Sequence, residues 1–233
     1  MATIASRLQQ VEQRIARACI AAGRPVDSVT LLAVSKTFSS ERLREAHGAG
    51  QHRFGENYVQ EALAKMDALA DLRAGIEWHL VGPLQSNKTR AVAERFDWVH
   101  SVDRVKLAER LSAQRPPGLS PLQVCLQVNL SGEASKSGLA PGAVAEVAQA
   151  VAHLPGLTLR GLMAIPEPCT GFEAQRRPHR ALHELLLALH GRGLAGLDTL
   201  SIGMSADLEA AIAEGATLVR IGTAIFGERV PTA

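Results

Sequence analysis

A single lysine, Lys36, ends the apolar run "VTLLAVSK" (29–36) and is followed at once by hydroxyl-bearing residues. Lysine is among the side chains least often buried without a partner, so Lys36 is either a solvated strand end or an amine placed for chemistry. The neutral amine of a lysine condenses with an aldehyde to form a Schiff base, which requires a partly desolvated lysine with a lowered pKa. Lys36 is therefore the first candidate for covalent chemistry.

Two glycine-containing segments near the C-terminus, "SIGMS" (201–205) and "RIGT" (220–223), together resemble an anion site. Glycines let backbone amides approach a ligand closely, and the hydroxyls of serine and threonine donate hydrogen bonds. Taken alone, Gly203 and Gly222 could equally serve tight turns. Their combination with Lys36 and Arg220 indicates a phosphorylated carbonyl ligand.

Two ligand classes satisfy this combination: a sugar phosphate, as in lysine-dependent aldolases, or pyridoxal 5′-phosphate (PLP). A guanidinium only donates hydrogen bonds, so Arg220 beside a pyridine nitrogen would keep that nitrogen unprotonated. An arginine could equally hold a substrate carboxylate. Local chemistry leaves the two classes open.

The elements that must position these residues alternate along the chain, because β-rich runs are separated by helix-like segments rich in Ala, Leu and Glu. This pattern predicts a parallel sheet with crossover helices, here a (β/α)8 barrel, with a doubly wound open sheet as the runner-up. The spacing of Ile4, Leu8, Val11, Ile15 and Ala18 adds an amphipathic N-terminal helix, and 1–233 is expected to form one domain. The expected strands are 28–35, 52–57, 76–82, 97–102, 122–130, 157–165, 198–203 and 217–227; the expected helices are 40–49, 57–70, 86–95, 103–114, 141–153, 173–191 and 205–214.

A barrel of this kind brings Lys36 and Arg220 together. Alternation puts Lys36 on the same face of the first strand as Val34, and Arg220 on the same face of the last strand as Gly222. Active sites lie at the carboxyl ends of barrel strands, and phosphate often binds after strands 7 and 8. Two cations at the seam between the first and last strands would repel each other, so an anion or electron-rich ligand is expected between them.

Bulk properties exclude several classes of function. The net charge is +2 and aromatic residues are only 3% of the chain, so neither nucleic acid nor an anionic membrane surface is an expected partner. No run of about 18 uncharged apolar residues is present to span a bilayer. Cys19, Cys125 and Cys169 are far apart and odd in number, which predicts three reduced thiols in a cytoplasmic protein.

Several motifs, in order, resemble the pyridoxal phosphate homeostasis protein family, whose fold is similar to the barrel domain of alanine racemase. The resemblance covers 28–228 and is most specific in the long C-terminal block. Its motifs are "AVSKT", "FGENYVQEA", "WHLVGPLQSNK", "HSVDR", "VNLSGEASKSGL", "GLMAIPE" and "LSIGMSADLEAAIAEGATLVRIGTAIFG".

The resemblance implies that Lys36 carries PLP as a Schiff base and that Arg220 faces the pyridine nitrogen. It assigns the phosphate to Ser201, Ser205, Gly222 and Thr223, with help from the amide of Met204, and the region near the ring to Asn57, His79, Asn129 and Met163. Many bacterial members have a second lysine where this chain has Phe38, so cofactor exchange is expected to differ here. Lys136 is retained and is either a secondary cofactor contact or a solvated loop lysine.

The family resemblance implies a monomeric protein that binds PLP and delivers it to apo forms of PLP-dependent enzymes. The alternative is a PLP-dependent racemase, which needs a proton donor on each face of the ring. The single tyrosine, Tyr58, starts a predicted helix and is expected to pack or face solvent. We therefore predict a carrier without catalytic turnover; His179, His183 and His190 are expected on a polar helix surface rather than at a metal.

Overall fold

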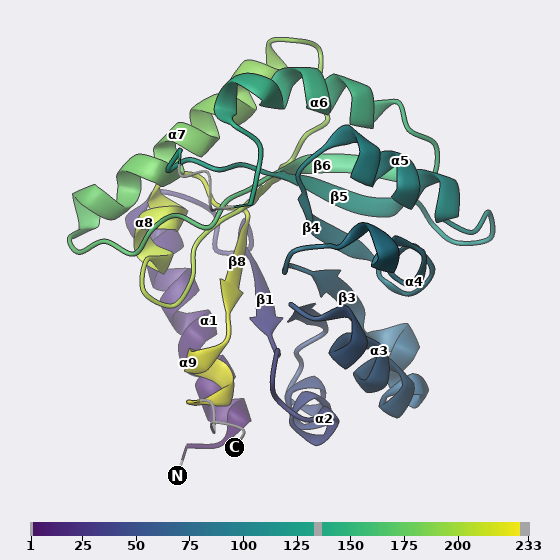
Figure 1. The fold of residues 1–233 in the computed structure, drawn as a ribbon. Helices are drawn as coiled ribbons and strands as arrows, with labels where there is room; N and C mark the ends of the chain where they lie inside the picture. The colour runs from purple at the N-terminus through teal and green to yellow at the C-terminus, as the bar shows by residue number, and fades with distance from the viewer. Residues whose placement is uncertain (1, 133–136, 229–233) are drawn as a thin grey trace.

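The computed structural model, which describes residues 2–132 and 137–228, contains a closed barrel of eight parallel strands that follow one another in chain order (Figure 1). Closure comes from β1 pairing with β8, where Leu32 lies opposite Arg220. The prediction of a barrel rather than an open sheet is confirmed. The strands are β1 (Thr30–Val34), β2 (Arg53–Glu56), β3 (Glu77–Leu80), β4 (Trp98–Val102), β5 (Leu122–Gln127), β6 (Leu157–Met163), β7 (Thr199–Ser201) and β8 (Leu218–Ile221).

The helices cover the outside of the barrel, as the ring of ribbons in Figure 1 shows. The additional helix α1 (Ile4–Ala21) packs against α8, α9 and α2, and it buries the apolar stripe that its sequence predicted. The Thr3 side chain caps it by accepting a hydrogen bond from the Ser6 amide. The other helices are α2 (Ser40–Gly48), α3 (Val59–Ala68), α4 (Thr89–Arg95), α5 (Val105–Gln114), α6 (Val144–Ala152), α7 (Phe172–His190), α8 (Leu208–Ala213) and α9 (Thr223–Phe226), with 3-10 turns η1 (Ala70–Gly75), η2 (Ser86–Lys88) and η3 (Pro141–Ala143).

The prediction of a strand over 217–227 is wrong for the second half of this range. β8 ends at Ile221, and the apolar residues after it form the short helix α9. The backbone turns at Gly222, where φ is −116° and ψ is −75°, and a Cβ there would lie only 3.0 Å from the Val34 carbonyl oxygen. An apolar run of this length does not distinguish strand from helix, and close packing against β1 decides the outcome.

The barrel interior is unusual because polar side chains run through it. Barrels of this type are generally filled with layers of Val, Ile and Leu. Here two small apolar clusters, Leu32–Val81–Leu218 and Trp98–Cys125–Met163, share the interior with a buried polar set. That set comprises His79, His100, Ser201 and Arg220.

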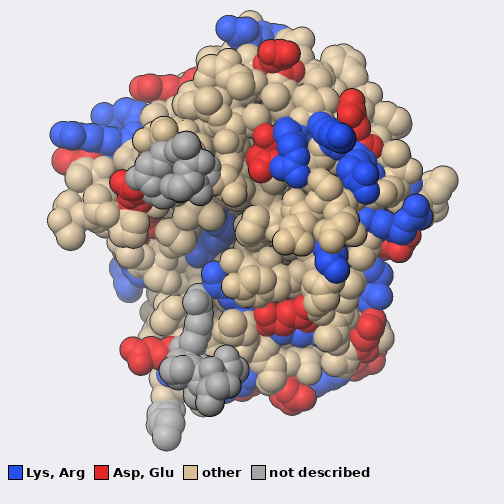
Figure 2. All heavy atoms as spheres, viewed as in Figure 1, with Lys and Arg blue, Asp and Glu red and all other residues tan. Residues whose placement is uncertain are grey.

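Charges are mixed over the surface. Figure 2 shows Lys and Arg side chains lying next to Asp and Glu on much of the visible face, in keeping with the net charge of +2. No helix among the described residues is long and apolar enough to cross a membrane. All three cysteines are free, as predicted; Cys19 and Cys125 are buried, and Cys169 is exposed.

Candidate functional site

A cavity of about 350 Å³ opens at the carboxyl ends of the strands and is called the carboxyl-end cavity below. Its size is within the usual range for small-molecule sites. It brings together seven of the residues predicted from the sequence: Lys36, Asn57, Met204, Ser205, Arg220, Gly222 and Thr223. Its other lining residues are Val34, Phe38, Val81, Ile165 and Ala206.

Lys36 lies just beyond β1, half-buried, at the start of a turn. The next residue, Thr37, has a φ of +70°, a left-handed conformation that costs a β-branched residue about 1–2 kcal/mol. The Thr37 amide donates a hydrogen bond of 2.5 Å to Glu61 Oε1 on α3. The turn that carries Lys36 is therefore held in an uncommon conformation by a neighbouring helix.

A buried ion pair supports the same turn from behind. Lys65 Nζ lies 2.7 Å from both Glu56 Oε1 and Glu61 Oε1, and it donates to the Ser35 carbonyl at 2.8 Å. The Ser35 hydroxyl donates to Glu56 Oε1 at 2.6 Å. Burial raises the pKa of Glu56, while the neighbouring Lys65 ammonium opposes this shift. Glu56, expected at the end of the second strand, thus points toward α3 and anchors the residue before Lys36.

Arg220 is buried at the base of the cavity, with only 5% of its surface exposed. Its Nη1 donates to the carbonyl and to the hydroxyl of Ser201, and its Nη2 donates to the Ala164 carbonyl at 2.8 Å. These bonds use three of the five guanidinium N–H groups. The other two have no acceptor among the residues that the structure describes, although Arg220 lines the cavity. Burial lowers the pKa of Arg220 to about 10, so the guanidinium stays charged at neutral pH.

The segment after β7 is fixed by Asp207. Gly203 has a φ of +90°, and a Cβ at this position would lie 2.6 Å from Ala211 Cβ, so only glycine fits. The Met204 amide donates to Asp207 Oδ1 at 2.6 Å, so this amide, expected to help hold a phosphate, already has an acceptor. His179 contacts Asp207 Oδ2 at 3.1 Å. The prediction of a polar helix surface is wrong for His179, which is fully buried against this segment.

Four residues predicted for the site do not line this cavity. His79 and Ser201 lie in the barrel interior, Met163 packs with Trp98 and Cys125, and Asn129 accepts hydrogen bonds from Ser131 after β5. A contact of these four with a bound molecule stays a prediction. Lys136 lies outside the described residues.

Apolar lining residues were largely missed from the sequence. Val34 was recognisable from alternation along β1, and Phe38 was noted because it replaces a lysine. In the structure, Phe38 stacks on Phe226 of α9, with ring centroids 5.0 Å apart and an angle of 27° between the rings. Tyr58, by contrast, is 58% exposed at the start of α3 and does not line the cavity, as expected for a helix start. Among the described residues, no group of three or more His, Cys, Asp or Glu side chains could hold a metal ion.

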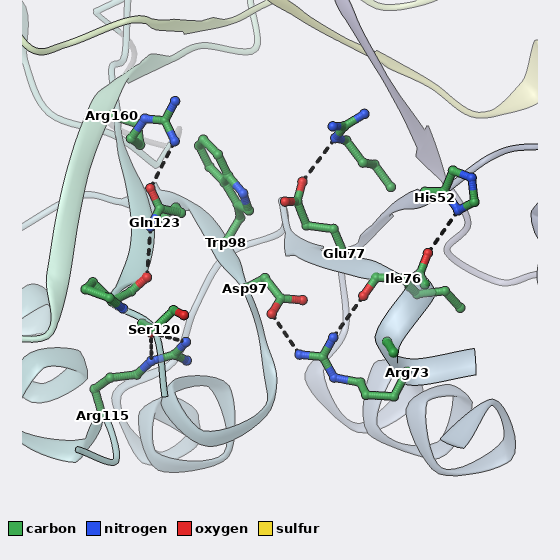
Figure 3. Close-up of a pocket in the computed structure, with 14 residues that line it drawn as sticks. His52, Arg73, Ile76, Glu77, Asp97, Trp98, Arg115, Ser120, Gln123 and Arg160 are labelled. Carbon is green, nitrogen blue, oxygen red and sulfur yellow. Dashed lines mark hydrogen bonds and ion pairs between the residues drawn. The ribbon is translucent and has the colours of Figure 1, made fainter. Parts of the chain in front are cut away.

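A larger cavity, of about 530 Å³, opens at the amino ends of β2–β6 and is called the amino-end cavity (Figure 3). Its walls carry Arg53, Arg73, Arg115 and Arg160, and each is already bonded to a carboxylate or to backbone carbonyls. Figure 3 shows the Trp98 ring between Arg160 and Glu77, and the Arg160 guanidinium lies 5.0 Å from the centre of that ring. These four cations therefore already have partners, whereas Arg220 in the smaller cavity keeps two N–H groups without an acceptor among the described residues.

Comparisons with known proteins agree on one family. The family model described as "Alanine racemase, N-terminal domain" matches residues 6–230. A curated relative from Pseudomonas aeruginosa named "Pyridoxal phosphate homeostasis protein" is 61% identical over 229 residues, covering 98% of this chain and 97% of the relative.

Two solved structures have folds similar to that of this chain. PipY from Synechococcus elongatus, solved with PLP bound, has a TM-score of 0.84 and 39% identity, and the match covers 97% of this chain and all of PipY. Alanine racemase from Corynebacterium glutamicum has a TM-score of 0.68 at 17% identity, a likeness of fold alone, with 97% of this chain matching 62% of the racemase.

Proposed function

The chain belongs to the pyridoxal phosphate homeostasis protein family, and from that premise we propose that it holds PLP in the carboxyl-end cavity and acts as a carrier of the cofactor. The main observation behind the proposal is that Lys36 and Arg220 line the same cavity. Two of the Arg220 N–H groups there lack an acceptor among the described residues. The PLP-bound structure of PipY, which matches this chain over 97% of its length, supports the same ligand.

The residues of the cavity suit PLP group by group. The hydroxyls of Ser205 and Thr223 and the close backbone approach at Gly222 fit a phosphate. The buried guanidinium of Arg220 fits an unprotonated pyridine nitrogen because it can only donate. Val34, Val81 and the other apolar lining residues suit the faces of an aromatic ring, and Asn57 adds a polar contact.

Lys36 has the role of covalent tether in this proposal. When bound, PLP supplies an aldehyde that condenses with a lysine amine and releases water. The protein's own contribution is to hold the turn that carries Lys36 through Thr37 and the Glu56–Lys65 pair, and to hold Arg220 in place through its bonds to Ser201 and Ala164. Contacts of His79, Asn129, Met163 and Ser201 with the cofactor stay predictions, since the four residues do not line the cavity.

We assign no catalytic turnover to the protein. A two-base racemase needs a proton donor on each face of the ring. Among the described residues that line the cavity, only Lys36 and Arg220 can carry a titratable proton, and a guanidinium is a poor acid at neutral pH. This composition favours a carrier over the racemase alternative.

The wider role follows from the same features. We propose that the protein holds the cofactor as a monomer. Three free thiols suit a reducing compartment such as the cytoplasm. We propose that the recipients are apo forms of PLP-dependent enzymes.

The test is direct. The purified protein is expected to be yellow with PLP, and borohydride reduction followed by peptide mass analysis should place the reduced adduct on Lys36. Lys36→Ala is expected to lose that adduct, whereas Lys88→Ala, a lysine outside the cavity, should keep it. A protein that takes up no PLP contradicts the proposal.

The carrier role needs a second assay. The loaded protein is incubated in turn with L-alanine and with an apo PLP-dependent enzyme. Activation of the apo enzyme without racemisation supports the carrier. Racemisation at ordinary enzymatic rates supports the alternative enzyme instead.

A further inference from the structure

A continuous chain of hydrogen bonds crosses the barrel from one mouth to the other. At the amino-end cavity, Glu77 Oε1 lies 2.9 Å from His79 Nε2, and His79 Nδ1 lies 2.9 Å from His100 Nε2. His100 Nδ1 then lies 2.8 Å from the Ser201 hydroxyl, which also accepts from Arg220 Nη1 at 2.9 Å. Arg220 lines the carboxyl-end cavity, so the chain joins the two cavities through the polar interior.

The carboxylate of Glu77 fixes the direction of the chain when both imidazoles are neutral. A guanidinium can only donate and a carboxylate can only accept. Since Arg220 donates to the Ser201 hydroxyl, that hydroxyl is free to donate to His100 Nδ1. His100 then donates through Nε2 to His79 Nδ1, and His79 donates through Nε2 to Glu77. Both imidazoles are neutral and protonated on Nε2 in this arrangement, and every donor has one acceptor.

The surroundings favour this neutral state. Both imidazoles are fully buried, and His79 stacks on Trp98 with ring centroids 5.3 Å apart. The charged groups that face the pair are Glu77, Asp97 and Arg53 at the amino-end mouth and Arg220 at the other end. Burial lowers the pKa of both histidines, and the like charge of Arg220 lowers that of His100 further.

We propose that His79 and His100 are positioning residues for the cofactor, which fix the Arg220 guanidinium and couple it to the charge of Glu77 at the opposite mouth. The inference rests on the proposed PLP site, because Arg220 matters through the ring that it would meet. The Glu77 side chain is 40% exposed, so a change in its charge or its partners in the amino-end cavity acts on the chain of hydrogen bonds at this residue (Figure 3). The two cavities are thereby linked by one polar chain through the barrel.

The first test uses the wild-type protein and needs no PLP. Nitrogen-15 NMR of the imidazole rings reports which ring nitrogen carries the proton. His79 and His100 are expected to be protonated only on Nε2 from pH 6 to pH 8, both before and after PLP is added. An Nδ1-protonated or doubly protonated ring at either position would overturn the inference.

The second test separates positioning from mere packing. His100→Phe keeps a ring but cannot accept from Ser201, and we expect the Kd for PLP to rise about tenfold, with a shifted absorption band, because a polar contact next to a charged group is lost. His100→Gln can donate and accept, and should stay within about threefold of wild type. A wild-type Kd and band for His100→Phe, or equal losses for both variants, would overturn the inference.

A matched pair of variants tests the coupling to the far mouth. Glu77→Gln and Asp198→Asn each remove one carboxylate charge at the amino ends of the strands, but only Glu77 belongs to the chain. Glu77→Gln should shift the His79 and His100 nitrogen resonances and raise the Kd for PLP about threefold, whereas Asp198→Asn should do neither. Equal effects of the two variants would contradict the coupling. If the wild-type protein does not bind PLP, the proposed function is wrong. The histidine nitrogen resonances of the unloaded protein would still show whether the chain of hydrogen bonds exists.

Discussion

The two mouths of the barrel handle charge in opposite ways. At the amino-end cavity, arginines meet carboxylates in partly exposed pairs such as Arg53–Glu77 and Arg160–Asp198. At the carboxyl-end cavity, Lys36 and Arg220 are among the described lining residues, and a buried ion pair, Glu56–Lys65, lies behind the wall. The arginines of the larger cavity thus have partners already, whereas Arg220 in the smaller one keeps two N–H groups without an acceptor among the described residues.

This difference teaches that pairing and burial, rather than cavity size, distinguish a ligand site from a stabilising surface. Exposed ion pairs contribute about 0–1 kcal/mol because water and salt screen them. Breaking a buried pair costs about 3–5 kcal/mol because it leaves one charge uncompensated. Removing charges from the two mouths should therefore have unequal effects.

The largest effect is expected from Lys65→Met, which leaves the buried Glu56 carboxylate without the Lys65 ammonium. We expect the free energy of unfolding to fall by about 3–5 kcal/mol. A double variant, Glu56→Leu with Lys65→Met, removes both charges and should recover much of this loss. Urea denaturation of the three proteins measures the changes.

The same variant should show a characteristic pH dependence. The pKa of Glu56 is already raised by burial, and loss of Lys65 raises it further. A carboxyl with a raised pKa in the folded state binds its proton more tightly when folded, so its contribution to stability is lost as pH rises above the unfolded value. Lys65→Met should be more destabilised at pH 8 than at pH 5, and a loss below about 1 kcal/mol at pH 8 would contradict the role of the buried pair.

The next effect compares one arginine from each mouth. Arg220→Gln should weaken PLP binding about 10- to 100-fold because a buried charged donor is lost, whereas Arg160→Gln should change the Kd less than about twofold. Absorbance titration with PLP measures both. Similar losses for the two variants would remove the functional distinction between the mouths.

The smallest effect is expected at an exposed pair. Asp198→Ala breaks the bond to Arg160, and the Asp198 side chain is 55% exposed. The loss in unfolding free energy should be below about 1 kcal/mol and should shrink further in 1 M salt. A loss as large as that of Lys65→Met would show that exposure does not separate the two kinds of pair.

The sequence was a good guide to the elements and to the centre of the site. Strand period is a local pattern, so alternation placed Lys36 and Arg220 at the carboxyl ends of their strands; the closed barrel was favoured over an open sheet and is confirmed by the pairing of β1 with β8. Gly203 and Gly222 were predicted to let backbone amides approach a phosphate; the structure shows the positive φ of Gly203 and the close packing of Gly222 against β1, and the phosphate contact stays a prediction.

Contacts between side chains that are far apart in the sequence could not be predicted. His100 lies in a run that looked like an ordinary strand, and only the closed barrel places it between His79 on β3 and Ser201 on β7. Likewise, nothing near Asp207 in the sequence indicates that His179 is buried against it. These contacts depend on packing between elements, which local periodicity does not encode.

The stack of Phe38 on Phe226 has a consequence for the width of the cavity. Phe38 follows the lysine turn and Phe226 ends the helix after the Gly222 turn, so the two rings fasten together the segments on either side of the cavity. Widening the cavity along this seam must first separate the rings, which costs about 0.5–1.5 kcal/mol beyond the area that they bury. That cost corresponds to a factor of about two to twelve in the equilibrium between the closed and the widened cavity, so the aromatic pair helps to hold the cavity at one width.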